Sequence, residues 1–312
     1  MKRDHKIRGL VFFAILVLLM SYSLGQAKPE TFEITILHSN DFHGANMELL
    51  AKRATIINKI RMESANPVLV LDAGDIFTRG PYQKRFYGAL EFAIMNEMKY
   101  DVITLGNNEF KATGNITAQK ILLDRIHQAN FPVLCANITD RQSGAYLPGV
   151  FPYIIKEFGE IKVAIFGVTT TKVAFYRQAK GWKVTNPILA AENIYNELAG
   201  KADIVLALTH IGLGQDISLA RKLPKIGAII GGDSHIVLLK PEMVGNVPVV
   251  QAGEYGKYLG RLDLTFEKTE SGWKLRDIQG GLINLTDPDI IPDHAVMKIF
   301  EDFLKKRVGD AA

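Results

Sequence analysis

Residues 33–44 read EITILHSNDFHG, and this stretch decides the fold. Its first six residues, from Glu33 to His38, are rich in β-branched side chains and predict a strand. Asp41 and His43 follow directly after that strand. A carboxylate and an imidazole are both suitable ligands for a divalent cation. The stretch therefore predicts a strand that delivers a metal-binding pair to the edge of a sheet.

Four further polar motifs follow apolar, strand-like runs in the same way. They are Gly74-Asp75, Gly106-Asn107-Asn108-Glu109, Thr209-His210 and Gly231-Gly232-Asp233-Ser234-His235. Together with the first stretch they offer a set of oxygen and nitrogen ligands that suits two divalent ions: Asp41, His43, Asp75, Asn107, His210, Asp233 and His235. Each residue alone could be a helix cap, a turn residue or a hydrogen-bonded core histidine. Their order, each at the end of a predicted strand, predicts a metal site.

The rest of the chain alternates strand and helix patterns. We expect strands at 67–71, 101–105, 132–135, 153–158, 161–168, 203–208, 226–230, 247–251, 258–266 and 273–283. We expect helices at 47–62, 84–98, 117–128, 186–198, 215–222 and 294–307. In an open α/β sheet the loops at the carboxyl ends of the strands carry the chemistry. The pattern thus predicts one α/β domain over residues 28–312, with the five motifs converging on one rim.

The first 27 residues are typical of a secretory signal. Residues 2–8 carry four basic side chains, residues 10–20 are apolar, and residues 25–27 offer the small side chains that a signal peptidase recognises. The alternative is an uncleaved membrane anchor, but the apolar run is shorter than the ~20 residues of a spanning helix. We therefore expect a signal peptide at 1–27, no stable membrane anchor after its cleavage, and a periplasmic or secreted protein.

Composition fits a large globular core and argues against a nucleic-acid-binding protein. The chain has 312 residues, of which 47% are hydrophobic and 22% are charged. Its formal charge is +4, but residues 1–27 hold four basic residues against Asp4, so the remainder carries only +1. A nearly neutral mature chain has no excess of basic residues for binding a nucleic-acid polymer. The single cysteine, Cys135, cannot form an intramolecular disulfide.

The motifs resemble those of the calcineurin-like metallophosphoesterases, and most closely the catalytic domain of the secreted bacterial 5′-nucleotidases. The resemblance is carried by LHSNDFHG at 37–44, LDAGD at 71–75 and YDVITLGN at 100–107. It extends from about Ile34 to about Leu282. It implies a four-layer αββα sandwich with two metal ions on its rim.

The resemblance also implies a role for each ligand. The first metal would be held by Asp41, His43 and His235, and the second by Asn107, His210 and Asp233. Asp75 would bridge the two ions, which could be Mn²⁺, Zn²⁺, iron or Mg²⁺. Hydroxide activated by the two metals would attack a small phosphomonoester, with nucleotides among the candidate substrates.

Three positions depart from the family pattern. The family usually has His where this chain has Asn108, and Asp three residues later, where this chain has Lys111. Asparagine can donate a hydrogen bond but cannot carry a proton, so we expect these two catalytic positions to attenuate activity. The family's GGHSH run reads GGDSH at 231–235, and the carboxylate of Asp233 favours hard ions such as Mn²⁺ or Mg²⁺, with Mn²⁺ as the first expectation.

Two function classes remain open from the sequence. The first is an exported phosphoester hydrolase, and the second is a metal-binding pseudo-enzyme that binds a phosphorylated ligand or partner without turnover. The complete set of ligand positions favours the enzyme, whereas the changes at Asn108 and Lys111 favour the pseudo-enzyme. We also expect the family's second, nucleobase-binding domain to be absent after Ala312, so that hydrolysis selects little among nucleotides.

Overall fold

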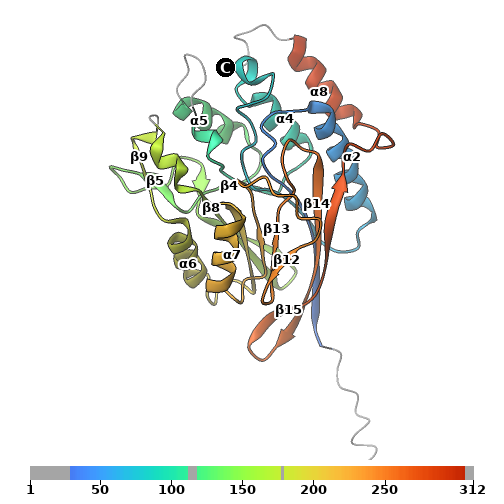
Figure 1. Cartoon of the computed structure of the whole chain (residues 1–312). Helices are drawn as coiled ribbons and strands as arrows, with labels where there is room; N and C mark the ends of the chain where they lie inside the picture. The colour runs from blue at the N-terminus through green and yellow to red at the C-terminus, as the bar shows by residue number, and fades with distance from the viewer. Residues whose placement is uncertain (1–28, 112–117, 177–178, 306–312) are drawn as a thin grey trace, which may run out of the picture. The chain divides into compact units, whose positions relative to one another are not determined.

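The computed structural model describes residues 29–111, 118–176 and 179–305. From residue 32 onward the chain clusters as one compact unit, in which helices flank two sheets (Figure 1). The expected signal peptide at 1–27 lies outside the described residues. In the part of the chain that is described, no helix has the length and apolar character needed to cross a membrane.

The first sheet has seven strands in the order β15-β14-β1-β2-β3-β4-β6. Its strands are β1 (Thr31–Ser39), β2 (Val68–Asp72), β3 (Val102–Thr104), β4 (Val133–Leu134), β6 (Val150–Phe151), β14 (Tyr258–Thr269) and β15 (Gly272–Asn284). Strands β1, β2, β3, β4 and β6 run parallel, and β14 and β15 form an antiparallel pair. Parallel strands place their carboxyl ends at the same edge, so the loops after β1, β2 and β3 are neighbours.

The second sheet has six strands in the order β12-β13-β11-β10-β8-β7. Its strands are β7 (Tyr153–Phe158), β8 (Ile161–Thr169), β10 (Ile204–His210), β11 (Ala228–Ile230), β12 (Glu242–Val244) and β13 (Val247–Val250). Strands β8, β10, β11 and β13 are parallel. A separate two-stranded sheet pairs β5 (Ile138–Asp140) with β9 (Trp182–Val184). The sequence did not predict β5, β9, β12 or β6, all of which have only two or three residues.

The two sheets pack face to face through one apolar cluster. Ile36 and Leu71 of the first sheet share that cluster with Ile165, Leu208 and Ile230 of the second. Side chains alternate between the two faces of a strand. The residues next to these in the strands therefore point away from the apolar cluster, to the outer face of each sheet. Helices α2 (Met47–Glu63), α4 (Ala89–Glu97), α5 (Ala118–Gln128) and α8 (His294–Lys305) cover the outer face of the first sheet.

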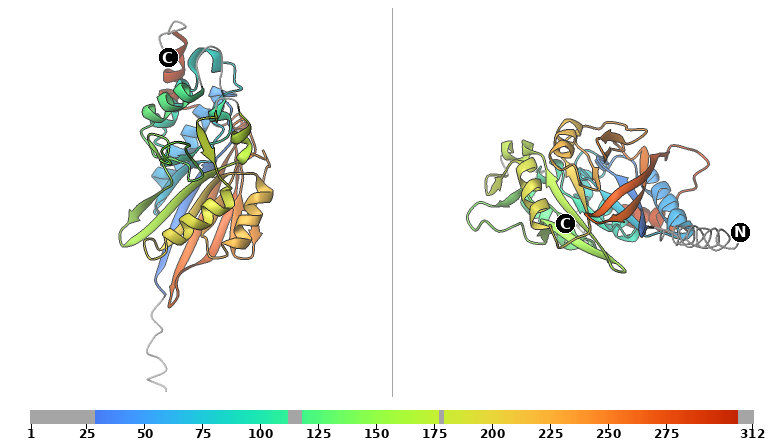
Figure 2. Two further views of the ribbon diagram at one scale, coloured as in Figure 1. Left: turned by 90° about the vertical axis from the view of Figure 1, so that its left-hand side faces the viewer. Right: turned by 90° about the horizontal axis from the view of Figure 1, so that it is seen from below.

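Helices α6 (Pro187–Glu197) and α7 (Leu213–Lys222) cover the outer face of the second sheet. Viewed from below, α2 and α6 lie on opposite sides of the sheets (Figure 2). The order helix, sheet, sheet, helix is the four-layer αββα sandwich that was expected, and that prediction is confirmed.

The prediction of one continuous helix over 84–98 is wrong. The structure has two helices there, α3 (Gln83–Phe86) and α4, separated by Tyr87 and Gly88. Both separating residues are left-handed, with φ of 48° and 82°. A Cβ on Gly88 would lie 2.8 Å from the ring of Phe77, so packing against that ring requires glycine there. Tertiary packing therefore overrides an unbroken helical pattern.

Candidate metal centre

The five predicted motifs meet at the carboxyl ends of the two sheets. The loops after β1 and β2 carry Asp41, His43 and Asp75, and the loop after β3 carries Asn107. From the second sheet, His210 is the last residue of β10, and the loop after β11 carries Asp233 and His235. Contacts of 3.1–3.9 Å between side chains of the two sheets join these loops into one cluster.

Backbone strain is concentrated at this cluster. Nine described residues other than glycine have positive φ, and five of them are predicted ligands: Asp41 (52°), His43 (56°), Asp75 (57°), Asp233 (78°) and His235 (57°). Each such conformation costs on the order of 1–3 kcal/mol. Hydrogen bonds between the loops hold two of them, from Asp41 N to Gly74 O (2.8 Å) and from His43 N to Asp75 O (2.9 Å). Strained backbone conformations of this kind are common at functional sites, where they point side chains in directions that an unstrained loop does not allow.

A first group of ligand atoms comprises Asp41, His43 and His235. His235 Nε2 lies 3.1 Å from Asp41 Oδ1, and His43 Nε2 lies 3.3 Å from His235 Nε2 and 3.8 Å from Asp41 Oδ1. These three atoms lie within 4.8 Å of one another. Among the described residues, Asp41 Oδ1 is a buried atom without a hydrogen-bond partner. A carboxylate oxygen facing two imidazole nitrogens is a suitable donor set for a divalent cation.

A second group centres on His210 and Asp75. His210 Nε2 lies 3.4 Å from Asp75 Oδ2, 3.8 Å from Asp233 Oδ1 and 3.9 Å from Asp41 Oδ1. Like Asp41 Oδ1, His210 Nε2 is buried and has no hydrogen-bond partner among residues 29–111, 118–176 and 179–305. Asp75 Oδ2 also lies 3.9 Å from His43 Nε2. Asp75 thus lies between the two groups, and so does Asp41, whose Oδ1 is within 4 Å of all three histidines.

Asn107 and Asp233 lie at the outer side of the second group. The side-chain amide of Asn107 is 2.8 Å from the hydroxyl of Tyr176. Turning that amide satisfies all of its neighbours and puts its nitrogen 3.1 Å from Asp233 Oδ1. Lys172 Nζ lies 2.7 Å from Oδ1 and 2.8 Å from Oδ2 of Asp233. Both predicted ligands therefore lie near the second group, and each also contacts another side chain: Asn107 contacts Tyr176, and Asp233 contacts Lys172.

Supporting hydrogen bonds orient two of the histidines toward the cluster. The carbonyl oxygen of Ala73 lies 2.6 Å from His210 Nδ1, and Oε2 of Glu254 lies 2.6 Å from His235 Nδ1. Each oxygen accepts the Nδ1 hydrogen, which leaves Nε2 as the ligand atom. Asn40 Nδ2 donates to Asp41 Oδ2 (2.7 Å), so Oδ1 is left to face the histidines.

The electrostatics of the cluster also favour cations. Burial lowers the pKa of His43 to about 4, so this ring is neutral and able to coordinate. Burial would lower the pKa of His210 too, but the negative charges of Asp75 and Asp41 outweigh it and raise that pKa well above its usual value. The same field that holds a proton on His210 attracts a divalent ion, which binds the neutral ring.

The two predicted catalytic positions reach the cluster through Asp75. The Asn108 backbone N–H donates to Asp75 Oδ1 (2.7 Å), and its side-chain amide donates to Asp75 Oδ2. Lys111 Nζ donates in turn to Asn108 Oδ1. Lys111 also lies over the ring of Tyr176, at 5.4 Å from its centroid. Asn108 is therefore a link between an ammonium group and the shared carboxylate.

Glu109 is a structural residue for which the sequence predicted no role. Its carboxylate is fully buried and accepts backbone hydrogen bonds from Asp75 (3.0 Å), Ile76 (2.8 Å) and Gly106 (2.7 Å). These bonds tie the loop after β2 to the loop after β3. The sequence also missed Lys172, Tyr176 and Glu254, which stand singly outside the motifs and give no signal.

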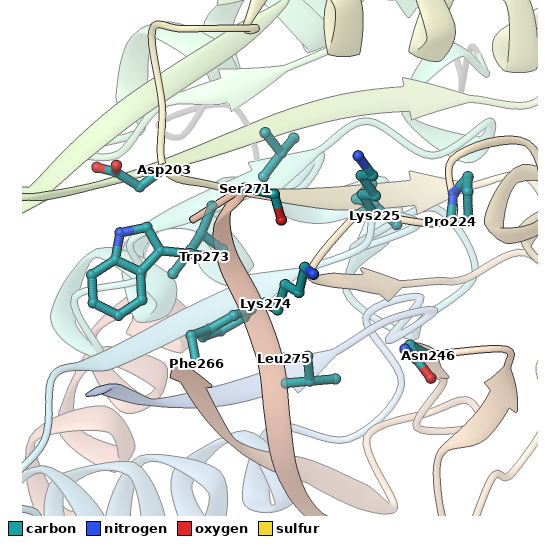
Figure 3. A pocket seen from close by; sticks show the side chains of 13 residues that line it. Asp203, Pro224, Lys225, Asn246, Phe266, Ser271, Trp273, Lys274 and Leu275 are labelled. Atoms are coloured by element: carbon teal, nitrogen blue, oxygen red, sulfur yellow. The ribbon is translucent and has the colours of Figure 1, made fainter. Parts of the chain in front are cut away.

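A separate cavity of about 240 Å³ lies at the other end of the strands. It is lined by residues that include Asp203, Lys225, Phe266 and Trp273 (Figure 3). Asp203 immediately precedes β10, whereas His210 ends that strand. None of the seven predicted ligands lines this cavity, so it is distinct from the candidate metal centre.

Comparison with known families agrees with this geometry. The family model described as "Calcineurin-like phosphoesterase" matches residues 34–237, which contain all seven predicted ligands. The chain belongs to the calcineurin-like phosphoesterases. This confirms the family resemblance.

Named relatives of this phosphoesterase chain include nucleotide-processing proteins. It is 32% identical over 273 residues to the trifunctional nucleotide phosphoesterase protein YfkN of Bacillus subtilis, covering 77% of this chain and 18% of that protein. It is 29% identical to a 5′-nucleotidase of Vibrio cholerae, covering 96% and 59% respectively. A solved 5′-nucleotidase precursor from Thermus thermophilus superposes with a TM-score of 0.76 at 25% identity, covering 87% of this chain and 58% of that one. The chain thus spans less than two thirds of each of these three proteins.

Proposed function

We propose that this protein hydrolyses small phosphomonoesters with the help of two divalent cations. The observation that carries the proposal is the position of Asp41 Oδ1, which is buried, has no hydrogen-bond partner in the described part of the chain and lies within 4 Å of three histidine nitrogens. A nucleotide is the substrate that the names of the relatives favour. No nucleic-acid polymer is proposed as a partner.

Seven residues would hold the cations. The first ion would bind Asp41, His43 and His235, the second would bind Asn107, His210 and Asp233, and Asp75 would be shared between them. The contacts of Asp75 Oδ2 with both His43 and His210 support that sharing. The chemistry supplied by the bound cations would be activation of water and stabilisation of charge on the phosphoryl oxygens. Mn²⁺ is favoured because three carboxylates make the donor set hard.

Three basic side chains around the site would bind the substrate's phosphate. Lys111 and Lys172 contact Asn108 and Asp233, next to the second group. Arg79 is close enough for its charge to act on both Lys111 and His235. Burial is the main cause of the lowered pKa of Lys111, and Arg79 adds to it; Asp41 is the main cause of the raised pKa of His235, and Arg79 opposes it. A phosphomonoester is a dianion at neutral pH, so these cations would orient it over the two ions.

Asn108 and Lys111 would take the positions of the family's proton-carrying pair. Asn108 cannot transfer a proton, so the leaving oxygen would depart without protonation by that residue. The positive charge of Lys111 would instead stabilise negative charge in the transition state. We therefore propose an enzyme that handles acidic leaving groups better than basic ones.

The second candidate is a metal-binding pseudo-enzyme. It is favoured by the hydrogen bonds of Asn108, whose side chain is engaged on one side by Asp75 and on the other by Lys111. Asp75 takes one of the two amide hydrogens and Lys111 occupies the oxygen, so only the second amide hydrogen is left to offer to a substrate. The protein would then bind a phosphorylated ligand or partner without turnover.

One experiment separates the two candidates. The purified protein is stripped of metal with a chelator, resupplied with Mn²⁺, and assayed for phosphate release from p-nitrophenyl phosphate and AMP. The enzyme hypothesis predicts release that depends on Mn²⁺. Tight binding of a phosphate ester in the presence of Mn²⁺ without any release would support the pseudo-enzyme instead.

We further propose that the protein is exported to the periplasm or secreted after removal of residues 1–27. The support is the basic, apolar and small-residue pattern of that segment. N-terminal sequencing of protein recovered from outside the cytoplasm should begin at Lys28, whereas an intact Met1 in that fraction would contradict cleavage.

A further inference from the structure

Lys172 is a residue with no motif around it that nevertheless reaches the candidate metal centre. It lies on the short 3₁₀ helix η2 (Thr171–Phe175), which the sequence did not predict. Its ammonium nitrogen is 2.7 Å from one oxygen of Asp233 and 2.8 Å from the other. A single cation therefore contacts both oxygens of one predicted ligand.

The segment that carries Lys172 is anchored on both sides of it. The Lys172 backbone N–H donates to Thr170 Oγ1 (3.4 Å), and Val173 is fully buried. At the end of the segment, the hydroxyl of Tyr176 lies 2.8 Å from the Asn107 amide. The segment thus contacts two predicted ligands of the same ion, Asn107 and Asp233. This anchoring favours a defined position for the Lys172 ammonium.

A divalent ion in the second group must compete with this ammonium. Asp233 Oδ1 faces both His210 Nε2, at 3.8 Å, and Lys172 Nζ. An ion that binds His210 and Asp233 therefore approaches a carboxylate that is already neutralised. The Lys172 side chain is more than half exposed, so solvent partly screens its charge. At 2.7 Å from the Asp233 carboxylate, its ammonium still repels an ion that binds the same oxygen.

The first group has the opposite arrangement. Its outer histidine, His235, has the carboxylate of Glu254 at 2.6 Å from Nδ1. A carboxylate behind a histidine ligand makes the ring a better donor and adds negative charge near the ion. The first group therefore has a carboxylate behind its predicted ligand His235, whereas the second group has an ammonium against its predicted ligand Asp233.

We propose that Lys172 is an internal counter-ion that competes with the second divalent cation for Asp233, so that the two cations bind in sequence with unequal affinity. The first occupies the Asp41, His43 and His235 group. The second displaces the Lys172 ammonium from at least one Asp233 oxygen. This inference rests on the proposed two-cation function and makes Lys172 a positioning residue for that centre.

The test is a titration of chelated protein with Mn²⁺ by isothermal titration calorimetry. The native protein should show two classes of site whose dissociation constants differ by at least about tenfold, which corresponds to about 1.4 kcal/mol. Lys172→Met, which keeps the length of the side chain but removes its charge, should tighten the weaker site several-fold and change the stronger one less than about twofold. Lys172→Arg keeps the charge and should retain the gap.

Lys222→Met is the matched control. Lys222 forms an exposed ion pair with Glu192 at 2.9 Å on the helices α7 and α6, so its loss removes an equivalent bridge far from the ligands. This variant should bind Mn²⁺ like the native protein. Thermal melting of each chelated variant checks that it is folded.

The outcomes separate this inference from the function on which it rests. Two sites whose gap is the same in native protein and Lys172→Met would overturn the role of Lys172 alone. Failure of both proteins to bind a second Mn²⁺ would overturn the two-cation function and this inference with it. A second site that appears only in Lys172→Met would support competition in its strongest form.

Discussion

Lys111 donates a hydrogen bond from its ammonium group to the side-chain oxygen of Asn108. The Asn108 amide in turn donates to Asp75, the carboxylate that lies between the two groups of predicted metal ligands. The positions where the family usually has a histidine and an aspartate thus hold a neutral amide and a cation. The charge of the second residue of the pair is therefore reversed: Lys111 is positive, whereas the aspartate of the family pattern is negative.

The double change Asn108→His with Lys111→Asp should restore a proton donor. A positioned donor contributes ~10²–10⁴-fold to rate, mostly for leaving groups that need protonation. We expect the rate on AMP to rise at least about tenfold more than the rate on p-nitrophenyl phosphate, whose leaving group is acidic. Steady-state rates on both esters measure this difference.

The single variants serve as controls for that pair. Asn108→His alone leaves the Lys111 ammonium beside the new imidazole, which disfavours its protonated form, so it should gain less on AMP than the double variant. Equal rate changes for both esters would show that proton donation is not what these positions lack.

Glu109→Gln should destabilise the fold although it is isosteric. The glutamate uses both oxygens to accept three backbone N–H groups, from Asp75, Ile76 and Gly106. Glutamine has one acceptor oxygen, so at least one buried N–H would lose its partner, at a cost of about 1–3 kcal/mol. Urea unfolding of chelated protein should show this loss. Glu160→Gln, at an exposed position between β7 and β8, should show none, and an equal effect of the two changes would refute the role of Glu109.

Glu91 should make the stability of the protein depend on pH. This α4 residue is almost fully buried, and burial raises its pKa from 4.5 to about 7 against the opposing effects of a backbone hydrogen bond and of Arg125. Because the folded pKa lies above the unfolded one, the folded state holds a proton that the unfolded state has released. The stabilisation is complete below the unfolded pKa and is lost as pH rises through about 7.

Glu91→Gln, which cannot ionise, should therefore help most at high pH. The melting temperature of the variant minus that of the native protein should increase between about pH 5 and about pH 8, by the equivalent of up to about 3 kcal/mol. Taking the difference between the two melting temperatures removes the contribution of the other titratable groups, because these are present in both proteins. A difference that stays constant with pH would mean that Glu91 is already ionised in the folded state.

Much of the site followed from the sequence because its residues lie at strand ends. The run from Glu33 to His38 is rich in β-branched side chains and predicts a strand, and the polar residues Asp41 and His43 follow it. The same reasoning found His210 and Asp233 in the second sheet. Parallel strands place such ends together, so residues far apart in the sequence could still be predicted to lie close together.

The remaining features depend on tertiary contacts that a sequence pattern does not contain. The break at Tyr87 and Gly88 follows from the packing of Gly88 against Phe77. Lys172 contacts Asp233 and Glu254 contacts His235, and both come from segments without helical or strand periodicity. A lone lysine or glutamate is usually a solvated surface residue. The sequence could therefore predict which loops meet at the candidate metal centre, but not which charged neighbours contact it.

The metal content of Asp75→Asn tests the central claim most directly. Asp75 Oδ2 contacts His43 at 3.9 Å and His210 at 3.4 Å, so one carboxylate serves both groups. The buried Asp216, which accepts a hydrogen bond from Thr209 Oγ1 and is not a predicted ligand, gives the control variant Asp216→Asn. After equilibrium dialysis against excess Mn²⁺, elemental analysis should find about two equivalents in the native protein and in Asp216→Asn. It should find most of both lost in Asp75→Asn, and two equivalents retained in Asp75→Asn would contradict the shared two-cation centre.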